Sequence, residues 1–232
     1  MVSTVSTTCG PRFGLVLCSQ FPRGDDPNAR FAEQIEQVRF ARDNGFDSTW
    51  VTQHYLAAPF QYLHPLAVLS RVIPESGDMR IGTAITLMAL GNPVDLAEEL
   101  ATIDIMSGGR LVVGAGLGYR DVEFDAFGVP RDERLRRFLD NLSVVRRLWT
   151  DEEVSFENAA VKLDRVRPAL RPVQEPHPPI WLAGHTDARC AAPPAWGCRG
   201  SRPPPTSTRT IWPARCGSSV RRAPSTGAPT PR

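Results

Sequence analysis

Two short stretches of this sequence place residues that can support chemistry directly after apolar runs. In the first, "VTQHY" at residues 51–55, His54 follows a run that begins near Phe46. An imidazole exchanges a proton close to neutral pH, so a histidine at a strand end is a candidate general acid or base. The alternative is a histidine whose nitrogens are satisfied by hydrogen bonds within its own loop.

The second stretch, "GGRLVVGAGLGYRD" at residues 108–121, contains Gly114, Gly116 and Gly118. A nucleotide-binding turn has the spacing G-x-G-x-x-G, follows the first strand and opens a helix at once. Here the spacing is G-x-G-x-G, the run is the fourth, and "YRDVEFDAFGVP" precedes any amphipathic helix, which disfavours a nicotinamide dehydrogenase. Two interpretations stay open: a flat ligand lying close to the bare backbone, or a tight strand exit in left-handed conformations.

A third stretch, "IGTAITLMALGNP" at residues 81–93, places the hydroxyls of Thr83 and Thr86 near the end of another apolar run, and Gly82 permits close approach. His64 and His177 lie beside prolines in loops and indicate no site. His185 follows the fifth apolar run and would lie at the same edge, but it borders an atypical C-terminal segment. The sequence has no P-loop, no G-x-S-x-G motif and no zinc-ligand spacing, so no metal site is expected.

The elements that position these stretches follow from a regular spacing. Apolar runs of β type begin near Phe13, Phe46, Met79, Arg110 and Pro179, and the first four starts lie 33, 33 and 31 residues apart. Helical patterns fill the intervals, so the spacing predicts parallel βα units. The carboxyl ends of such strands meet at one edge, where the three stretches would converge.

The first helix is predicted over residues 28–44. Phe31, Ile35 and Val38 recur at helical spacing and would face the core. Gly45 follows as a left-handed stop.

Two further helices are predicted after Asn92, which is a good N-cap with Pro93 behind it, and from Pro130 onward. Their expected core positions are Leu96, Leu100 and Ile103 in the first, and Leu135, Phe138, Leu142, Val145 and Trp149 in the second. Between the last helix and the last strand, "EVSFENAAVKLDRV" predicts a short hairpin.

Composition restricts the class of protein. The chain has 232 residues and a net charge of +2, so no overall field points to nucleic acid or membrane. The N-terminal residues lack a signal-peptide pattern, and no apolar stretch reaches the roughly 18 residues of a transmembrane span. Five cysteines without a C-x-x-C pair predict reduced thiols in a cytoplasmic protein, with Cys18 as a small core residue.

Residues 188–232 differ from the rest of the chain. They contain no Asp or Glu, eight Arg and nine Pro, without helical or strand periodicity, so we expect this segment to be disordered. Of the 27 basic residues in the whole chain only Lys162 is not arginine, which is typical of a GC-rich coding sequence. We favour a shifted reading frame near Asp187 over a genuine disordered extension. Nucleic-acid binding is disfavoured because no basic cluster in the tail exceeds two residues.

Together, "FAEQIEQVRFARDNGFDSTWVTQHY", "RIGTAITLMALGNPVDLAEELATIDIMSGGRLVVGAGLGYRDVEFDAFGV" and "PPIWLAG" resemble the luciferase-like flavin-dependent monooxygenases and oxidoreductases. The resemblance covers about residues 13–187 and implies an α/β fold, a partial TIM-type (β/α)8 barrel. Members of the family complete eight strands, whereas about five βα strands are present here before the disordered tail.

The resemblance also implies site residues. His54 would be catalytic and exchange a proton with the substrate, although Gln53 stands where family members often carry an acid. The residues expected to bind the flavin are Ala84, Ile85, Thr86, Gly116, Gly118 and Tyr119. A non-prolyl cis peptide bond between Ala84 and Ile85 would support the flavin ring from behind.

The implied cofactor is FMN, with a 5-deazaflavin coenzyme as the alternative, acting on a small organic substrate through reduced flavin and O2 or by hydride transfer. The expected protein partners are a flavin reductase and a second copy of the chain, and neither nucleic acid nor membrane is expected. Because the strand pattern stops early, the alternative function is an inactive fragment of the family. Its open sheet edges would make it poorly stable.

Overall fold

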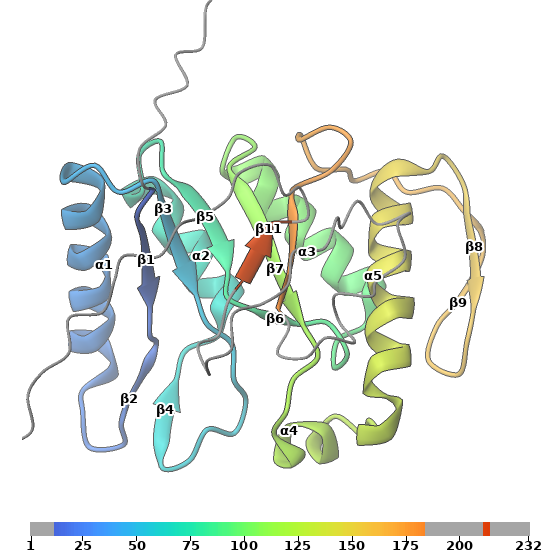
Figure 1. Ribbon diagram of the computed structural model, residues 1–232, viewed down its shortest axis with the longest axis horizontal. Helices are drawn as coiled ribbons and strands as arrows, with labels where there is room; N and C mark the ends of the chain where they lie inside the picture. The colour runs from blue at the N-terminus through green and yellow to red at the C-terminus, as the bar shows by residue number, and fades with distance from the viewer. Residues whose placement is uncertain (1–11, 184–210, 214–232) are drawn as a thin grey trace, which may run out of the picture.

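The computed structural model describes residues 12–183 and 211–213, and these build a parallel sheet with helices packed against one face (Figure 1). The sheet order is β1-β3-β5-β7-β10, followed by β11, with β6 paired to β7. These strands are β1 Gly14–Leu17, β3 Ser48–Val51, β5 Arg80–Thr83, β6 Thr86–Leu87, β7 Leu111–Gly116, β10 Ile180–Ala183 and β11 Ile211–Pro213. All neighbouring pairs are parallel except β10 with β11, so the βα repeat predicted from the sequence spacing is confirmed.

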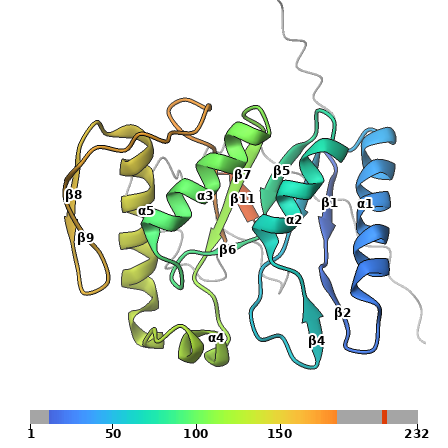
Figure 2. The same ribbon diagram turned by 180° about the vertical axis from the view of Figure 1, so that it is seen from behind.

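The connecting helices lie on a single face of the sheet, which the view from behind shows directly (Figure 2). They are α1 Pro27–Asp43, α2 Pro65–Val72 with η1 Ile73–Glu75, α3 Pro93–Met106 and α5 Arg134–Thr150. The short α4 Asp121–Ala126 lies instead beyond the carboxyl end of β7 (Figure 1), and η2 Arg131–Glu133 follows it in the chain. Between this layer and the sheet lies the core, in which Leu17, Val51, Ile81 and Leu111 are fully buried. The arrangement is that of a partial TIM-type barrel, as predicted.

The helix boundaries agree closely with their sequence signals. Asp26 caps α1 by accepting from the Asn28 amide, and Gly45 follows with φ +75°. Asn92 caps α3 in the same way through Val94. Because capping side chains satisfy the first free amides of a helix, such residues fix where a helix begins.

Two of the predicted core positions are wrong. Leu135 is 54% exposed, because residues 131–133 form a short 3₁₀ turn and α5 begins only at Arg134, with Leu135 in its outward-facing first turn. Cys18 is exposed, because it follows β1 on the side opposite the buried Leu17.

Two antiparallel ladders extend the fold. The predicted hairpin is confirmed as β8 Val154–Glu157 and β9 Lys162–Val166, outside α5. A second ladder, β2 Gln20–Pro22 with β4 Phe60–Tyr62, lies beyond the carboxyl ends of β1 and β3 (Figure 1). No sequence pattern indicates this second pairing, since its strands are only three residues long. This ladder lies at the carboxyl edge of the sheet, the same edge at which His54 follows β3.

The face of the sheet opposite the helices carries two tryptophans in contact. The rings of Trp50 on β3 and Trp181 on β10 lie 4.8 Å apart, although β5 and β7 separate these strands. Three strand spacings of a flat sheet span about 14 Å. The two side chains therefore span the intervening strands, and the bare Gly82 lets the Trp50 ring lie across β5.

Of the tail expected to be disordered, residues 188–232, only β11 belongs to the described residues. His185 also lies outside the described residues. Within the described ranges, no helix is both long enough and apolar enough to cross a membrane.

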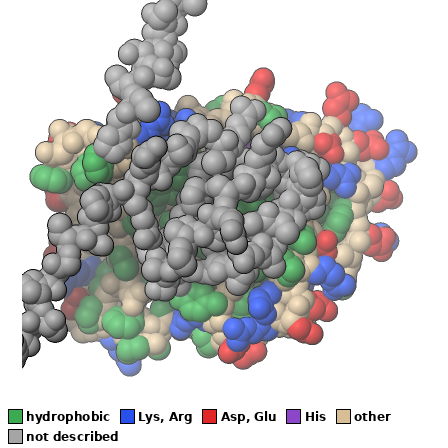
Figure 3. Space-filling model, viewed as in Figure 1, with side chains coloured by type: hydrophobic (Ala, Val, Ile, Leu, Met, Phe, Trp, Pro, Cys, Tyr) green, Lys and Arg blue, Asp and Glu red, His purple; other side chains and the backbone are tan. Residues whose placement is uncertain are grey.

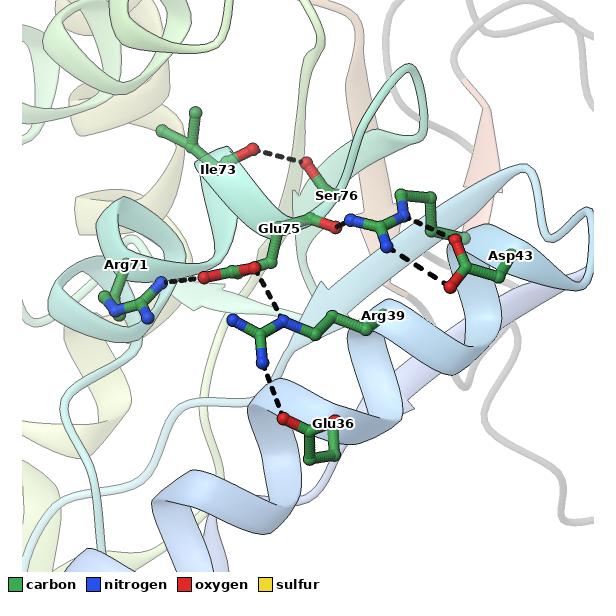
Figure 4. Close-up of polar contacts among 8 residues, drawn as sticks. Glu36, Arg39, Asp43, Arg71, Ile73, Glu75 and Ser76 are labelled. Carbon is green, nitrogen blue, oxygen red and sulfur yellow. Dashed lines mark hydrogen bonds and ion pairs between the residues drawn. The ribbon is translucent and has the colours of Figure 1, made fainter.

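An ion-pair network ties α1 to α2 and η1 (Figure 4). Glu75 accepts from Arg39 at 2.8 Å and from Arg71 at 2.6 Å. Arg42 of the same helix face donates to the Glu75 backbone carbonyl at 3.0 Å. The two guanidinium groups, Arg39 first, lower the pKa of Glu75 from 4.5 to about 2.

A lowered carboxyl pKa stabilises the fold above the unfolded-state pKa, and this contribution disappears as the pH falls through the folded-state value. Glu75→Gln should therefore lower the Tm at pH 7, and the difference from wild type should shrink below pH 4.5 and vanish as the pH falls past about 2. Calorimetric melts at stepwise pH measure this. Glu98→Gln, at an exposed position of α3, is the matched control for loss of one charge. An equal Tm change for Glu75→Gln at all pH values would contradict the assignment.

Candidate active site

The side chains of His54 and Glu123 meet at the carboxyl edge of the sheet. His54 lies in the loop after β3, and Glu123 lies on α4 after β7. The distance from His54 Nδ1 to Glu123 Oε1 is 2.9 Å. Glu123 is fully buried, whereas the His54 side chain is 18% exposed. The pair thus combines a carboxylate shielded from solvent with an imidazole that a ligand can reach.

The hydrogen bonds around Glu123 define the tautomer of the histidine. Besides His54, Oε1 accepts from the Tyr55 backbone amide at 2.9 Å and from Arg120 Nη1 at 3.2 Å. An amide and a guanidinium can only donate, so Glu123 Oε1 is the acceptor. His54 therefore donates through Nδ1–H, and its Nε2 is the nitrogen that can accept a proton.

Arg120 links the same two loops through the backbone. Its guanidinium donates to the Tyr55 carbonyl at 2.7 Å and to the Leu56 carbonyl at 3.1 Å. The charges of Arg120 and Glu123 thereby compensate each other beside His54. The second Glu123 oxygen, Oε2, has no hydrogen-bond partner among the described residues.

The short helix α4 has no counterpart among the predicted elements, because "YRDVEFDAFGVP" has the pattern of an irregular connection. Gly118 has φ +79° and turns the chain directly into α4. Phe124 is 1% exposed and anchors this helix in the core. Six residues give too little periodicity to detect. The partner of His54 escapes prediction together with the helix, because no local pattern indicates a contact across 69 residues.

Gln53, expected at a position where family members carry an acid, is buried and structural. Its Oε1 accepts from the Leu87 amide at 2.8 Å, and its Nε2 donates to the Tyr55 hydroxyl at 2.7 Å. These bonds hold the end of β3 against β6. Burial raises the pKa of the Tyr55 phenol, so this hydroxyl stays protonated at neutral pH.

The peptide bond between Ala84 and Ile85 is cis, as expected from the resemblance. Beside it, Thr86 donates to the Thr83 hydroxyl at 2.9 Å, and Thr83 donates to the Gly114 carbonyl at 2.9 Å. This chain of hydroxyls connects the segment between β5 and β6 to β7. Ala84 and Ile85 are partly exposed, while Thr86 is buried.

The glycines of β7 are required by this packing. A Cβ on Gly114 would lie 2.0 Å from the Thr83 carbonyl oxygen, and one on Gly116 would lie 1.9 Å from the Ile85 side chain. The space that the bare backbone leaves is therefore filled by the protein itself at both positions. Gly118, in contrast, serves the left-handed strand exit. The structure thus shows internal packing at Gly114 and Gly116 and a left-handed strand exit at Gly118, and the approach of a flat ligand to this segment stays a prediction.

Two tyrosines flank the imidazole of His54. Tyr62 lies with its ring centroid 5.5 Å away at 87°, and Tyr119 lies 5.7 Å away at 84°. Tyr62 also forms a hydrogen bond with the Thr52 hydroxyl. Tyr119 is 52% exposed, so the aromatic surroundings of His54 open towards solvent on its side.

The sequence-predicted site residues therefore come from three strand ends that neighbour one another in the sheet. His54 follows β3, Ala84, Ile85 and Thr86 lie between or on β5 and β6, and Gly116, Gly118 and Tyr119 end β7. Across residues 12–183 and 211–213, no group of three or more His, Cys, Asp or Glu side chains could hold a metal ion. The chemistry available at this edge is proton exchange at His54.

Comparison with known proteins identifies the family that this sequence matches. The family described as luciferase-like monooxygenase matches residues 11–192. The structure of monooxygenase RslO1 from Streptomyces bottropensis superimposes with a TM-score of 0.66 at 30% identity, over 74% of this chain and 53% of that one. An F420-dependent secondary alcohol dehydrogenase, in complex with an F420–acetone adduct, gives 0.63 at 25% identity, over 75% and 52%.

Among relatives in sequence, the FMNH(2)-dependent dimethylsulfone monooxygenase of Pseudomonas putida is 28% identical over 165 residues, which are 68% of this chain and 40% of that protein. The chain thus spans about half the length of the proteins that it matches.

The packing of the glycines generates a stability prediction. Gly114→Ala should destabilise the protein by about 1–3 kcal/mol, because the new methyl group meets a backbone oxygen that cannot rotate away. Gly24→Ala is the control, since no atom lies within 4 Å of the position that its new methyl group would take. This control should change stability by less than about 0.5 kcal/mol. Urea denaturation of both variants measures the difference, and equal stabilities would contradict the packing argument.

Proposed function

Because the chain belongs to the luciferase-like monooxygenase family, we propose that it is a flavin-dependent oxidoreductase acting on a small organic substrate. The proposal is carried by one observation, the hydrogen-bonded pair of His54 and Glu123 at the carboxyl edge of the parallel sheet. This is the edge at which parallel α/β barrels place their active sites.

His54 is the proposed proton-exchanging residue. Glu123 holds Nδ1–H, which directs Nε2 away from the carboxylate as the basic atom. When Nε2 takes a proton, the negative charge of Glu123 stabilises the imidazolium that forms. Arg120 and the Tyr55 amide hold the Glu123 carboxyl group in place, so that the imidazole is oriented before a substrate arrives.

The residues near His54 suit a planar cofactor. Ala84, Ile85, Gly118 and Tyr119 are at least partly exposed and are the proposed contacts of the flavin ring. The buried Gly116 and Thr86 would support these contacts from beneath, because the side chain of Ile85 already covers Gly116. A bound reduced flavin would supply the hydride, or the electrons for reaction with O2. The protein's part is to hold the ring and to shield the reacting atoms from water.

FMN is the proposed cofactor, with 5-deazaflavin as the alternative. The dimethylsulfone monooxygenase is FMNH(2)-dependent, whereas the secondary alcohol dehydrogenase uses F420. An FMNH2-dependent reaction needs a supply of reduced flavin, so a flavin reductase is a proposed partner. A homodimer is proposed as the assembly. Residues 13–187 are the proposed cofactor-binding part of the chain.

The alternative function is an inactive fragment, because the chain spans about half the length of the proteins it matches. We retain the proposal that residues 188–232 arise from a shifted reading frame, which sequencing the DNA across codons 180–195 tests directly. Titration of the purified chain with FMN, FMNH2 and a 5-deazaflavin, followed by absorbance, separates the two functions. Saturable binding of one of them supports the enzyme, and absence of binding by all three supports the fragment.

Replacement of the pair should impair turnover in a graded way. With FMNH2 from a reductase, O2 and a panel of small organic compounds, His54→Asn should lower the rate of product formation by about a hundredfold or more. Glu123→Gln keeps an acceptor oxygen but loses the charge, and should lower it about tenfold. Mass spectrometry of the products measures both rates.

Flavin binding by each variant is measured beside its rate, so that a loss of turnover can be separated from a loss of the cofactor. Both variants should bind the flavin like wild type, because neither side chain is a proposed flavin contact. Phe40→Ala, at a 66% exposed position of α1, is the control and should leave turnover unchanged. Wild-type rates in His54→Asn would overturn the assignment of His54.

A further inference from the structure

The edge that carries His54 exposes an unusual amount of apolar surface. Its two loops, residues 52–63 and 117–128, follow β3 and β7. Five of their large hydrophobic side chains are more than two-fifths exposed: Leu56 60%, Phe60 42%, Tyr119 52%, Val122 43% and Phe127 43%. Hydrophobic side chains are visible along this lower edge of the molecule in Figure 3. We call these five side chains the apolar rim.

Aromatic rings connect the apolar rim to the imidazole. Tyr119 and Tyr62 both stand nearly perpendicular to His54, at 84° and 87°. Tyr55 packs against Phe127 with ring centroids 4.7 Å apart. Rings in this arrangement offer faces and edges to an incoming ring, and aromatic pairs of this geometry are favourable beyond the area that they bury.

The charges of these loops are almost all compensated within the protein. Residues 52–63 contain no Asp, Glu, Lys or Arg. In residues 117–128 the only cation is Arg120, and its guanidinium is used by Glu123 and two backbone carbonyls. Asp121 pairs with Arg131, while Asp125, at an exposed position of α4, is the one acidic side chain of the two loops without an ion-pair partner among the described residues. An anionic ligand would therefore find no available cation on the two loops beside His54, and the buried charge of Glu123 is already balanced by Arg120.

We propose that the site takes a neutral aromatic substrate that bears a hydroxyl group, with the ring against Tyr119 and Tyr62 and the hydroxyl donating to His54 Nε2. This inference rests on the proposed function, because it specifies the substrate class of the same site. Glu123 fixes the proton of the imidazole on Nδ1, so Nε2 is a hydrogen-bond acceptor. The substrate hydroxyl supplies the donor that Nε2 requires. A neutral ring suits this site because it needs no charged partner on the two loops.

Four fluorescent probes of one shape test the inference without any flavin: 2-naphthol, 2-methylnaphthalene, 2-naphthalenesulfonate and 2-naphthylmethylammonium. The full chain is titrated into each probe at pH 7, and the Kd is taken from the fluorescence change. We expect 2-naphthol to bind most tightly and 2-methylnaphthalene several-fold more weakly, because it lacks the hydroxyl. We expect the sulfonate and the ammonium to bind at least about tenfold more weakly than naphthol, since a charge placed between the rings beside His54 loses its hydration without an ion-pair partner at that position.

Variants assign the binding to the rim. Tyr119→Ala should weaken naphthol binding about fivefold, while Tyr119→Phe keeps the ring and should retain it. His54→Phe should abolish the preference for naphthol over 2-methylnaphthalene. Phe40→Ala removes an aromatic ring from α1 that is more exposed than Tyr119, and it should have no effect.

Tighter binding of the sulfonate or the ammonium than of naphthol would overturn the proposed substrate class, and so would absence of binding by all four probes. Equal naphthol binding in wild type and Tyr119→Ala would overturn the role of the rim. Because these titrations contain no flavin, flavin binding without naphthol binding refutes this inference alone. Failure of all three flavins to bind refutes the proposed function instead.

Discussion

The buried carboxylate of Glu123 is the interaction on which the geometry of the site depends. One of its oxygens receives the Tyr55 amide, the Arg120 guanidinium and the His54 imidazole, and these groups belong to loops that follow two different strands. A carboxylate excluded from water is costly unless it is paired and hydrogen-bonded, so the loops are held together for as long as the charge stays buried. The orientation of His54 is thus a consequence of a stability requirement.

A second constraint lies beneath the site, where two positions of β7 have no room for a side chain. Gly114 and Gly116 leave room for the Thr83 carbonyl and the Ile85 side chain, and the Thr83 hydroxyl bonds across the same gap. The segment that carries Ala84 and Ile85 is therefore seated by contacts on its inner side. Its partly exposed outer side remains available at the edge that carries His54.

The parts of this structure that depend on local patterns can be predicted from the sequence. Strand starts spaced by about 32 residues, the cap at Asn92 and the stop at Gly45 are encoded within a few neighbouring positions. The partner of His54 cannot be predicted in this way, because Glu123 lies on a six-residue helix and meets the histidine only after both strands have joined the sheet. The wrong placement of Cys18 has a related reason: an apolar run shows that a strand is buried, but does not show which of its faces meets the helices.

The contact between Trp50 and Trp181 has a consequence for how this fold can be observed. The two indoles belong to the second and the fifth parallel strand, and they meet across the intervening strands because Gly82 leaves room for the Trp50 ring. Two indoles at 4.8 Å couple their electronic transitions. The near-ultraviolet circular dichroism of the protein should therefore contain a signal that reports side-chain packing across the face of the sheet opposite the helices, separate from the helical signal that reports the layer on the other face.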